Sequence, residues 1–413
     1  MISTRKSLAA TGAVCAMALA SGAAAQQLDV WTLNFSSDAN NDALESIAEE
    51  FEAANPGVDV VFTQRGVDEH KTALRVSAGS NTGPDIFFSW AGLGLGGEYV
   101  NAGMSLPLDG YYEEYGWSDT LLPSAAAFAD VYEGGKHGVP YTFKGEAVYY
   151  NKALFEQAGI AGEPATYDEL LAAAEKLKEN GTPAFTFGGT VNWHLMRLMD
   201  ELLETTCGAE VHEQLVAMEA NWGETECAVQ AFGEMQKWAD NYILKPFMGI
   251  DQQQSFNLFI ANRAAMMLEG NWLVQQIAEA RDLADFGIFP FPTGTGRLYG
   301  FAEYHYIASN SDTPDLAAKF LDFFNSTDVQ QRYLGTFASN SVNAEVVYDD
   351  IRPLDAEWNE IFAEYQQMFV NRDQGFPGNI VPEYFRVINQ VATDEMTPQQ
   401  AAEALQTFID NNR

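Results

Sequence analysis

The sequence predicts an α/β protein with two interleaved lobes, each a mostly parallel sheet flanked by helices. Short apolar runs alternate with amphipathic runs in both halves of the chain, an order typical of parallel sheets covered by helices. The length allows two domains of ordinary size. No polar linker, internal repeat or low-complexity tract separates the halves, so we expect the lobes to interleave along the chain.

The N-terminal part of the chain shows the clearest alternation. We expect strands at 28–33, 58–63 and 84–90, and helices at 43–54 and 69–78. Leu44, Ile47 and Phe51 recur at helical spacing, and Asn55-Pro56-Gly57 ends that helix. Right-handed crossovers between such strands place functional loops at the carboxyl ends of the strands.

The second half repeats this style. Thr166 and Glu169 form a capping box that opens a helix ending near Lys178. Thr313-Pro314 and Thr397-Pro398 each open a helix with threonine as the N-cap and proline in the first position. The helix that Thr313-Pro314 opens is expected to end at 325. Further strands are expected at 183–188, 264–268 and 286–291, and further helices at 192–205, 225–242 and 271–281.

The N-terminus has the features of a secretory signal peptide. Arg5 and Lys6 precede a short apolar stretch at 8–19, and Ala23-Ala24-Ala25 fits the small-residue rule for cleavage. We expect the mature chain to begin at Gln26, which makes residues 1–25 the signal peptide and the protein periplasmic. A retained membrane anchor is the alternative, and the stretch is too short to favour it.

The chain is strongly acidic, with a formal net charge of −36. Nucleic acids and anionic membrane surfaces need basic patches, so the charge argues against both as partners. It also disfavours a densely anionic ligand. Solubility in salty surroundings explains the acidity without any partner.

Cys207 and Cys227 are the two cysteines that remain after the expected cleavage. A pair of cysteines in an oxidising compartment usually forms a disulfide, here closing a loop of about 20 residues and stabilising by roughly 3 kcal/mol. Free thiols are the alternative. A metal or redox role has less support because no CxxC spacing occurs.

Five segments, taken in order, resemble the sugar-binding proteins of bacterial ABC importers, the family typified by maltose-binding protein. The segments are 83–91 (GPDIFFSWA), 138–160 with its Gly/Pro turn, apolar strand and Asn151 stop, 264–272 (AAMMLEGNW), 317–324 (AAKFLDFF) and 379–397. The resemblance covers nearly the whole mature chain.

That resemblance implies a fold of the periplasmic binding protein type II kind, with a ligand cleft between the lobes. Lobe one is then expected at 26–145 plus 303–340, and lobe two at 146–302 plus 341–413. The third crossing between the lobes is expected near 339–343, where this sequence lacks the proline of the family pattern.

A sugar site needs aromatic rings for the apolar faces of the sugar and polar groups for its hydroxyls. Trp90 precedes a glycine-rich loop, and Trp193 begins a helix after two glycines. Trp272 and Glu146 match sugar-contacting positions of the family that the chain resembles. The alternative for Glu146 is a salt bridge with Lys144 in the same strand.

Further candidates lie at the ends of expected strands and on a late helix: Asn34, Asp38, Glu303, His305 and Tyr384. Asn34 and Asp38 could instead cap the helix that follows them. His305 could instead be a hydrogen-bonded histidine of the core.

These features predict a monomeric binding protein that captures an oligosaccharide or glycoside by hinge closure, using no cofactor or metal. The expected partners are the sugar and the transmembrane subunits of an ABC importer. A binding protein for an anionic polyol such as glycerol phosphate is the alternative, and it would need more basic residues at the cleft than Lys144. A secreted glycosidase, the other alternative, would need a pair of carboxylates about 5–10 Å apart.

Overall fold

The computed structural model describes residues 26–34, 37–80, 82–336, 340–349, 351–365 and 367–412. The expected signal peptide, with cleavage near Ala25, lies outside the described residues. Within the described ranges, no helix is both long enough and apolar enough to cross a membrane.

The N-terminal strands form the parallel part of the sheet, as expected. The first elements are β1 (Gln26–Leu33), α1 (Asp38–Ala54), β2 (Val58–Arg65), α2 (Val67–Ala78) and β3 (Ile86–Trp90). β1 lies between β2 and β3, with Val30 paired to Phe62 on one side and to Ile86 on the other. All five elements match their predicted positions to within a few residues.

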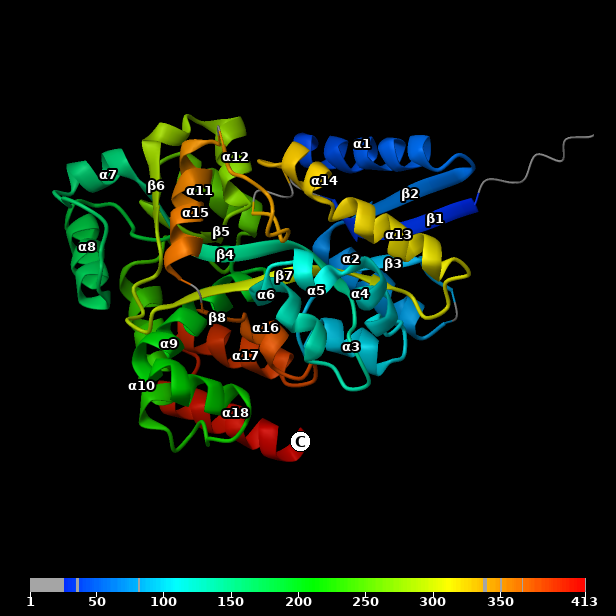
Figure 1. Ribbon diagram of the computed structural model, residues 1–413. Coiled ribbons are helices and arrows are strands. Elements are labelled where there is room, and N and C mark those ends of the chain that lie inside the picture. Colours follow the sequence, from blue (N-terminus) through cyan, green and yellow to red (C-terminus); the bar gives the residue numbers. More distant parts are fainter. Residues whose placement is uncertain are drawn as a thin grey trace, which may run out of the picture.

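Two long strands cross the middle of the molecule (Figure 1). The remaining strands are β4 (Val139–Asn151), β5 (Met266–Gly270), β6 (Phe286–Phe289), β7 (Arg297–Ile307) and β8 (Gln367–Phe369). The strand order is β2-β1-β3-β7-β4-β5, with β6 on β4 and β8 on β7. Every antiparallel pair of these named strands includes β4 or β7. The parallel pairs are β1-β2, β1-β3 and β7-β8, so the parallel pairing expected of both lobes is concentrated in the first.

The buried apolar side chains follow this arrangement. One group comes from residues 28–143 and 302–342, and the others come from 147–298 and 354–409. Each lobe is therefore built from separate stretches of chain, which confirms the predicted α/β class with two interleaved lobes. α13 (Pro314–Phe324) illustrates the interleaving, since its Phe320 ring packs 5.1 Å from Phe51 of α1.

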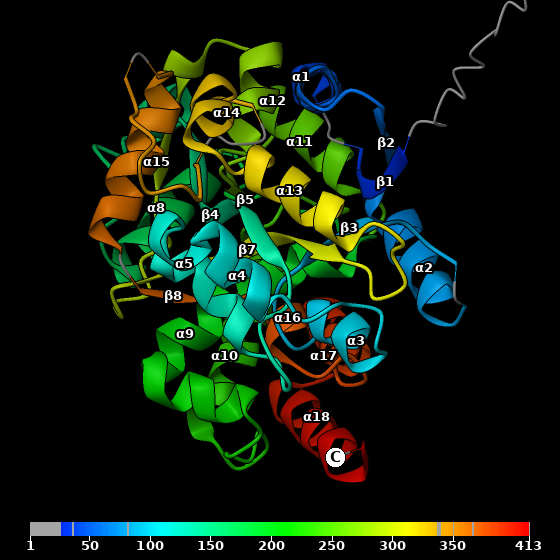
Figure 2. The same ribbon diagram turned by 45° about the vertical axis from the view of Figure 1, so that its right-hand side comes forward.

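Helices cover the sheet on both lobes (Figures 1 and 2). The smaller lobe-one helices are α3 (Gly96–Asn101), α4 (Asp109–Tyr115), α5 (Trp117–Thr120), α6 (Pro123–Ala126) and α14 (Thr327–Arg332). The others are α7 (Lys152–Gln157), α8 (Tyr167–Glu179), α9 (Asn192–Val216), α10 (Glu226–Asn241), α11 (Gln252–Ile260), α12 (Leu273–Ala280), α15 (Pro353–Glu364), α16 (Arg372–Gly375), α17 (Val381–Ala392) and α18 (Pro398–Asn412). α9, α10, α17 and α18 pack together at the bottom of both views.

Local signals in the sequence are mostly confirmed. Thr166 and Glu169 form the capping box of α8, and the Asn151 side chain accepts a hydrogen bond from the Leu154 amide at the start of α7. The strand expected at 183–188 is wrong: Phe185 forms isolated parallel bridges, and no regular strand is present there.

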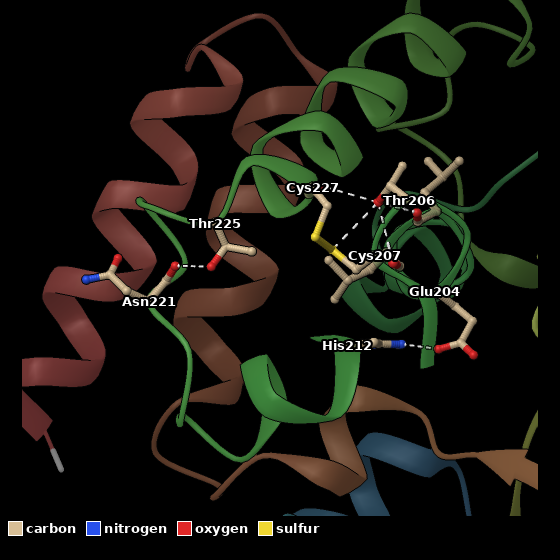
Figure 3. Close-up of a disulfide and its surroundings, with 9 residues drawn as sticks. Glu204, Thr206, Cys207, His212, Asn221, Thr225 and Cys227 are labelled. Carbon is tan, nitrogen blue, oxygen red and sulfur yellow. Dashed lines mark hydrogen bonds and ion pairs between the residues drawn. A yellow bond between two sulfur atoms is a disulfide. The ribbon is translucent and has the colours of Figure 1, made fainter. Parts of the chain in front are cut away.

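The predicted disulfide between Cys207 and Cys227 is confirmed, with their Cα atoms 5.0 Å apart (Figure 3). It joins α9 to the first turn of α10. Cys207 directly precedes Gly208, whose φ of 68° interrupts the helical backbone of α9. The Thr206 hydroxyl donates a hydrogen bond to the Cys227 carbonyl at 3.0 Å, so the bridge is held at the point where α9 bends.

Candidate binding cavity between the lobes

A cavity of about 190 Å³ lies where the crossing strands pass between the lobes. Lobe one contributes the end of β1, the start of α1, part of α2 and the end of β3. Lobe two contributes the start of α9, α11, the start of α12 and residues 371–374, while β4 and β7 supply Lys144, Phe301 and Glu303. Elements from both halves of the chain therefore meet at one site, as expected for the carboxyl ends of strands in such folds.

Three tryptophans line this cavity, and each is partly exposed: Trp90, Trp193 and Trp272. The Arg197 guanidinium lies 4.4 Å from the Trp193 ring centre and 5.1 Å from that of Trp272. Across the cavity, the Lys71 ammonium lies 4.9 Å from the Trp90 ring. The site thus offers broad ring faces with hydrogen-bond donors beside them.

Arg197 is also the centre of a buried charge cluster. Its Nε lies 2.7 Å from Glu146 Oε2, and its Nη1 lies 2.6 Å from Glu269 Oε2. Burial raises the pKa of Glu146 to about 7, although the charge of Arg197 opposes this shift. Burial and the charge of Arg197 lower the pKa of His194 well below its ordinary value, so its 3.5 Å contact with Glu269 is that of a neutral imidazole.

A second buried pair lies on the crossing strands. Lys144 Nζ is 3.7 Å from Glu303 Oε2, which also accepts a hydrogen bond from the Tyr141 hydroxyl at 3.3 Å. Burial lowers the pKa of Lys144 and raises that of Glu303. Lys144 therefore pairs with Glu303 of β7, and the alternative salt bridge between Lys144 and Glu146 does not form.

Five of the predicted site residues come together at the cavity wall: Asn34, Trp90, Trp193, Trp272 and Glu303. They are brought there by β1, β3, α9, α12 and β7, from both lobes. Ligand contact at these five positions stays a prediction.

The other four predicted residues do not line the cavity. Asp38 is exposed at the first position of α1. Glu146 is fully buried behind Arg197, with which it pairs. His305 is buried against Tyr141, with ring centres 4.2 Å apart, and Tyr384 is buried with its hydroxyl bonded to Asp200.

The structure places these four residues away from the cavity wall, and the physical reasons differ. His305 and Tyr384 lie on the faces of their elements that pack into the cores, and their polar atoms do not reach the cavity. Burial penalises the charge of Glu146 on β4, and the compensation comes from Arg197 of α9. Its contribution to the cavity is therefore indirect.

Several cavity residues carried no recognised signal in the sequence. They are Lys71, Arg197, Arg352, Asn371, Asp373 and Gln374. Arg197 follows Trp193 by one helical turn, and this spacing could have revealed it. The segment 371–374 has no periodic pattern, because it forms a short turn of helix between β8 and α17.

Within the described ranges, no three His, Cys, Asp or Glu side chains come together in a way that could hold a metal ion. Paired charges and partly exposed rings are what the cavity offers to a ligand.

The model of one protein family, bacterial extracellular solute-binding protein, matches residues 36–331. A binding protein of Brucella abortus (strain 2308) is 27% identical over 80% of this chain and 79% of its own length. The maltotriose-binding protein of Pyrococcus abyssi is 26% identical over 68% of this chain and 59% of its own. The melibiose/raffinose/stachyose-binding protein of Bacillus subtilis is 23% identical over 70% of this chain and 68% of its own.

Solved structures show the same fold. A chitin oligosaccharide binding protein superimposes with a TM-score of 0.85 at 23% identity, covering 94% of this chain and 99% of its own. The GacH receptor of Streptomyces glaucescens superimposes with a TM-score of 0.77 at 21% identity, covering 94% and 98%.

Proposed function

The chain belongs to the bacterial extracellular solute-binding protein family, and we propose that it captures a neutral saccharide in the cavity between its lobes and delivers it to an ABC importer. The family is one of binding proteins, and the proposal requires no covalent chemistry. The observation that carries it is the meeting of Trp90, Trp193 and Trp272 with paired polar side chains in one cavity. Rings stack on the C–H faces of sugars, and the polar groups satisfy hydroxyls.

The pairing of charges supports a neutral ligand. Lys144 pairs with Glu303, Arg197 pairs with two carboxylates, and Arg352 pairs with Asp355 at 2.5 Å. Basic side chains that already have carboxylate partners would have to give them up to bind a densely anionic group. Glycerol phosphate, the alternative ligand, finds its best support at Lys71, whose ammonium lies over the Trp90 ring.

Relatives support the saccharide class. Two carry names that specify maltotriose and the melibiose/raffinose/stachyose group. Others, from Rhizobium meliloti and Mesorhizobium japonicum, are named as probable sugar-binding periplasmic proteins. We propose a periplasmic location for this chain too, with residues 1–25 as its signal peptide.

Contacts across the cavity support closure around the ligand. The Ser37 hydroxyl at the start of α1 donates to Glu279 Oε1 of α12 at 2.9 Å, and the Gly94 amide donates to the Gln374 carbonyl at 2.9 Å. We propose lobe one as 26–145 plus 303–340 and lobe two as 146–302 plus 341–413. The group of buried side chains from 28–143 and 302–342 supports these bounds to within two residues. Ser339, part of the expected third crossing, lies outside the described residues.

The decisive experiment is a thermal-shift screen of mono- to tetrasaccharides, with glycerol 3-phosphate included, followed by calorimetric titration of each hit. We expect a neutral saccharide to raise the melting temperature and to be recovered intact after incubation. A response to glycerol 3-phosphate alone would favour the anionic ligand, and cleavage of the saccharide would favour a glycosidase.

Trp272→Ala tests the stacking role. It removes a ring from the cavity wall, so the free energy of saccharide binding should become less favourable by on the order of 1–3 kcal/mol. Trp31→Ala is the matched control, because Trp31 is also partly exposed but lies outside the cavity, beside Arg65. Equal loss of affinity in both variants would contradict the assignment of Trp272 to the site.

A further inference from the structure

Three polar side chains in the short segment 371–374 line the cavity and have acceptor oxygens with no protein partner. They belong to Asn371, Asp373 and Gln374, which are 5%, 7% and 2% exposed. Asn371 Oδ1, Asp373 Oδ1 and Gln374 Oε1 are buried without any hydrogen-bond donor among the described residues. Buried polar atoms are nearly always paired, so three in one segment need an explanation.

The carboxylate of Asp373 is the most unusual of the three. No described basic side chain lies within ion-pair distance of it. Burial raises its pKa, while the charges of Lys71 and Arg197 and hydrogen bonds from the backbone amides of Asp373 and Gln374 oppose this shift. Burying a carboxylate without a charged partner, and with Oδ1 accepting no hydrogen bond, is costly. A residue of this kind at a cavity wall is expected to receive its partner from whatever fills the cavity.

The backbone of the same segment is held firmly from behind. The Arg372 amide donates to Asp200 Oδ2 at 3.0 Å, and the Tyr299 hydroxyl donates to the same oxygen at 2.6 Å. The Tyr384 hydroxyl donates to Asp200 Oδ1 at 2.7 Å. Asp200 is fully buried in α9, so it fixes the start of α16 to a long helix of lobe two.

The loop after β3 holds the segment from the opposite side. The Gly94 amide donates to the Gln374 carbonyl, and a Cβ atom at Gly94 would lie 2.2 Å from the Asp373 carbonyl oxygen. The main chain of 371–374 is thus fixed on two sides while its side-chain acceptors stay unpaired. A fixed backbone with unpaired acceptors is the arrangement expected of a preorganised binding surface.

We propose that residues 371–374 form a recognition wall that accepts hydrogen bonds from ligand hydroxyl groups, with Asp373 as its central acceptor and Asp200 as the positioning residue behind it. This inference rests on the proposed function and deepens it, because it assigns hydroxyl donors of the saccharide to one face of the cavity. The wall should distinguish a hydroxyl, which donates, from a fluorine, which cannot.

The test compares wild type, Asp373→Asn and Asp200→Asn by calorimetric titration with the saccharide found in the screen and with its monodeoxyfluoro analogues. Asp373→Asn should weaken saccharide affinity by about 10- to 100-fold, the range for a hydrogen bond to a charged group. In wild type, at least one fluorine substitution should cost a similar factor, and in Asp373→Asn that additional loss should shrink severalfold. Asp200→Asn should reduce the same discrimination, which a residue with a purely structural role would leave intact.

The free proteins provide a readout that needs no ligand. Removal of a buried charge that has no ion-pair partner should leave the melting temperature of Asp373→Asn at pH 8 unchanged or higher than that of wild type. Asp312→Asn is the matched control, since Asp312 is exposed and lies outside the cavity.

A lower melting temperature together with wild-type affinity and wild-type fluorine discrimination would overturn the recognition wall. Unaltered discrimination in Asp200→Asn would overturn the positioning role. If wild type binds no saccharide, the proposed function fails, and the melting temperature of free Asp373→Asn still decides whether this wall is built for a ligand.

Discussion

Glu146→Gln is expected to make the stability of the ligand-free protein less dependent on pH. The Glu146 carboxylate is fully buried, accepts a hydrogen bond from Asn371 Nδ2 at 2.7 Å and lies 2.7 Å from Arg197 Nε. Burial raises its pKa from 4.5 to about 7. Glutamine has the same shape and keeps an acceptor for Asn371, but it does not titrate.

The sign follows from proton linkage. A carboxyl group whose pKa is raised on folding binds protons more tightly in the folded state, so its stabilising contribution is complete below its unfolded pKa and is lost as the pH rises through its folded pKa. Each pH unit between the two values corresponds to about 1.4 kcal/mol. From 4.5 to about 7, the wild type should therefore lose about 3 kcal/mol of unfolding free energy relative to the glutamine variant.

Urea unfolding of both proteins at pH 5 and pH 8 measures this difference. The free energy of unfolding of wild type minus that of Glu146→Gln should be larger at pH 5 than at pH 8. Glu45→Gln controls for the loss of one carboxylate at an exposed position. Stability differences that stay the same at both pH values would show that Glu146 does not titrate between them, and the account of the Arg197 cluster would be wrong.

Two other changes probe the bridge and the aromatic wall. Replacing both Cys207 and Cys227 by serine opens a loop of 20 residues. The unfolding free energy, measured with urea, should fall by about 3 kcal/mol, and ligand affinity should stay unchanged. An unaltered urea midpoint would contradict this. Gly270→Ala would place a Cβ atom 1.9 Å from the Trp272 ring, so the ring must move. Saccharide affinity, measured by calorimetry, should therefore fall. Wild-type affinity in this variant would show that the position of the ring does not matter for binding.

Much of the fold could be predicted because its signals are local. Helical spacing located α1, and the capping box located the start of α8. The expected strand at 183–188 failed because its pairing does not extend: Phe185 bridges Ile243 and Met266, each as a single parallel pair.

The site was predicted in part, because its residues are brought together by the fold. Trp90 ends β3 and Trp272 follows β5, and a strand end is visible in a sequence. The role of Glu146 depends on Arg197 of α9, and the pairing of a β4 carboxylate with that helix appears only in the folded structure. Asp373 lies in a short turn of helix with no periodic pattern, so its position at the cavity wall becomes visible only once Asp200 and Gly94 are seen on either side of the segment.

The place of β7 in the sheet makes completion of lobe one depend on a late part of the chain. The apolar strand IFFSW of β3 gains its second neighbour only when β7 arrives, since Trp90 pairs with Glu303. Phe51 of α1 packs against Phe320, which lies even later in the chain than β7. A nascent chain that stops before β7 presents an unpaired edge, which favours association with other chains, and long-range pairing of this kind slows folding. Truncation between the lobes would therefore yield an aggregation-prone fragment, and a usable isolated lobe would require the two stretches of chain to be rejoined by a designed linker.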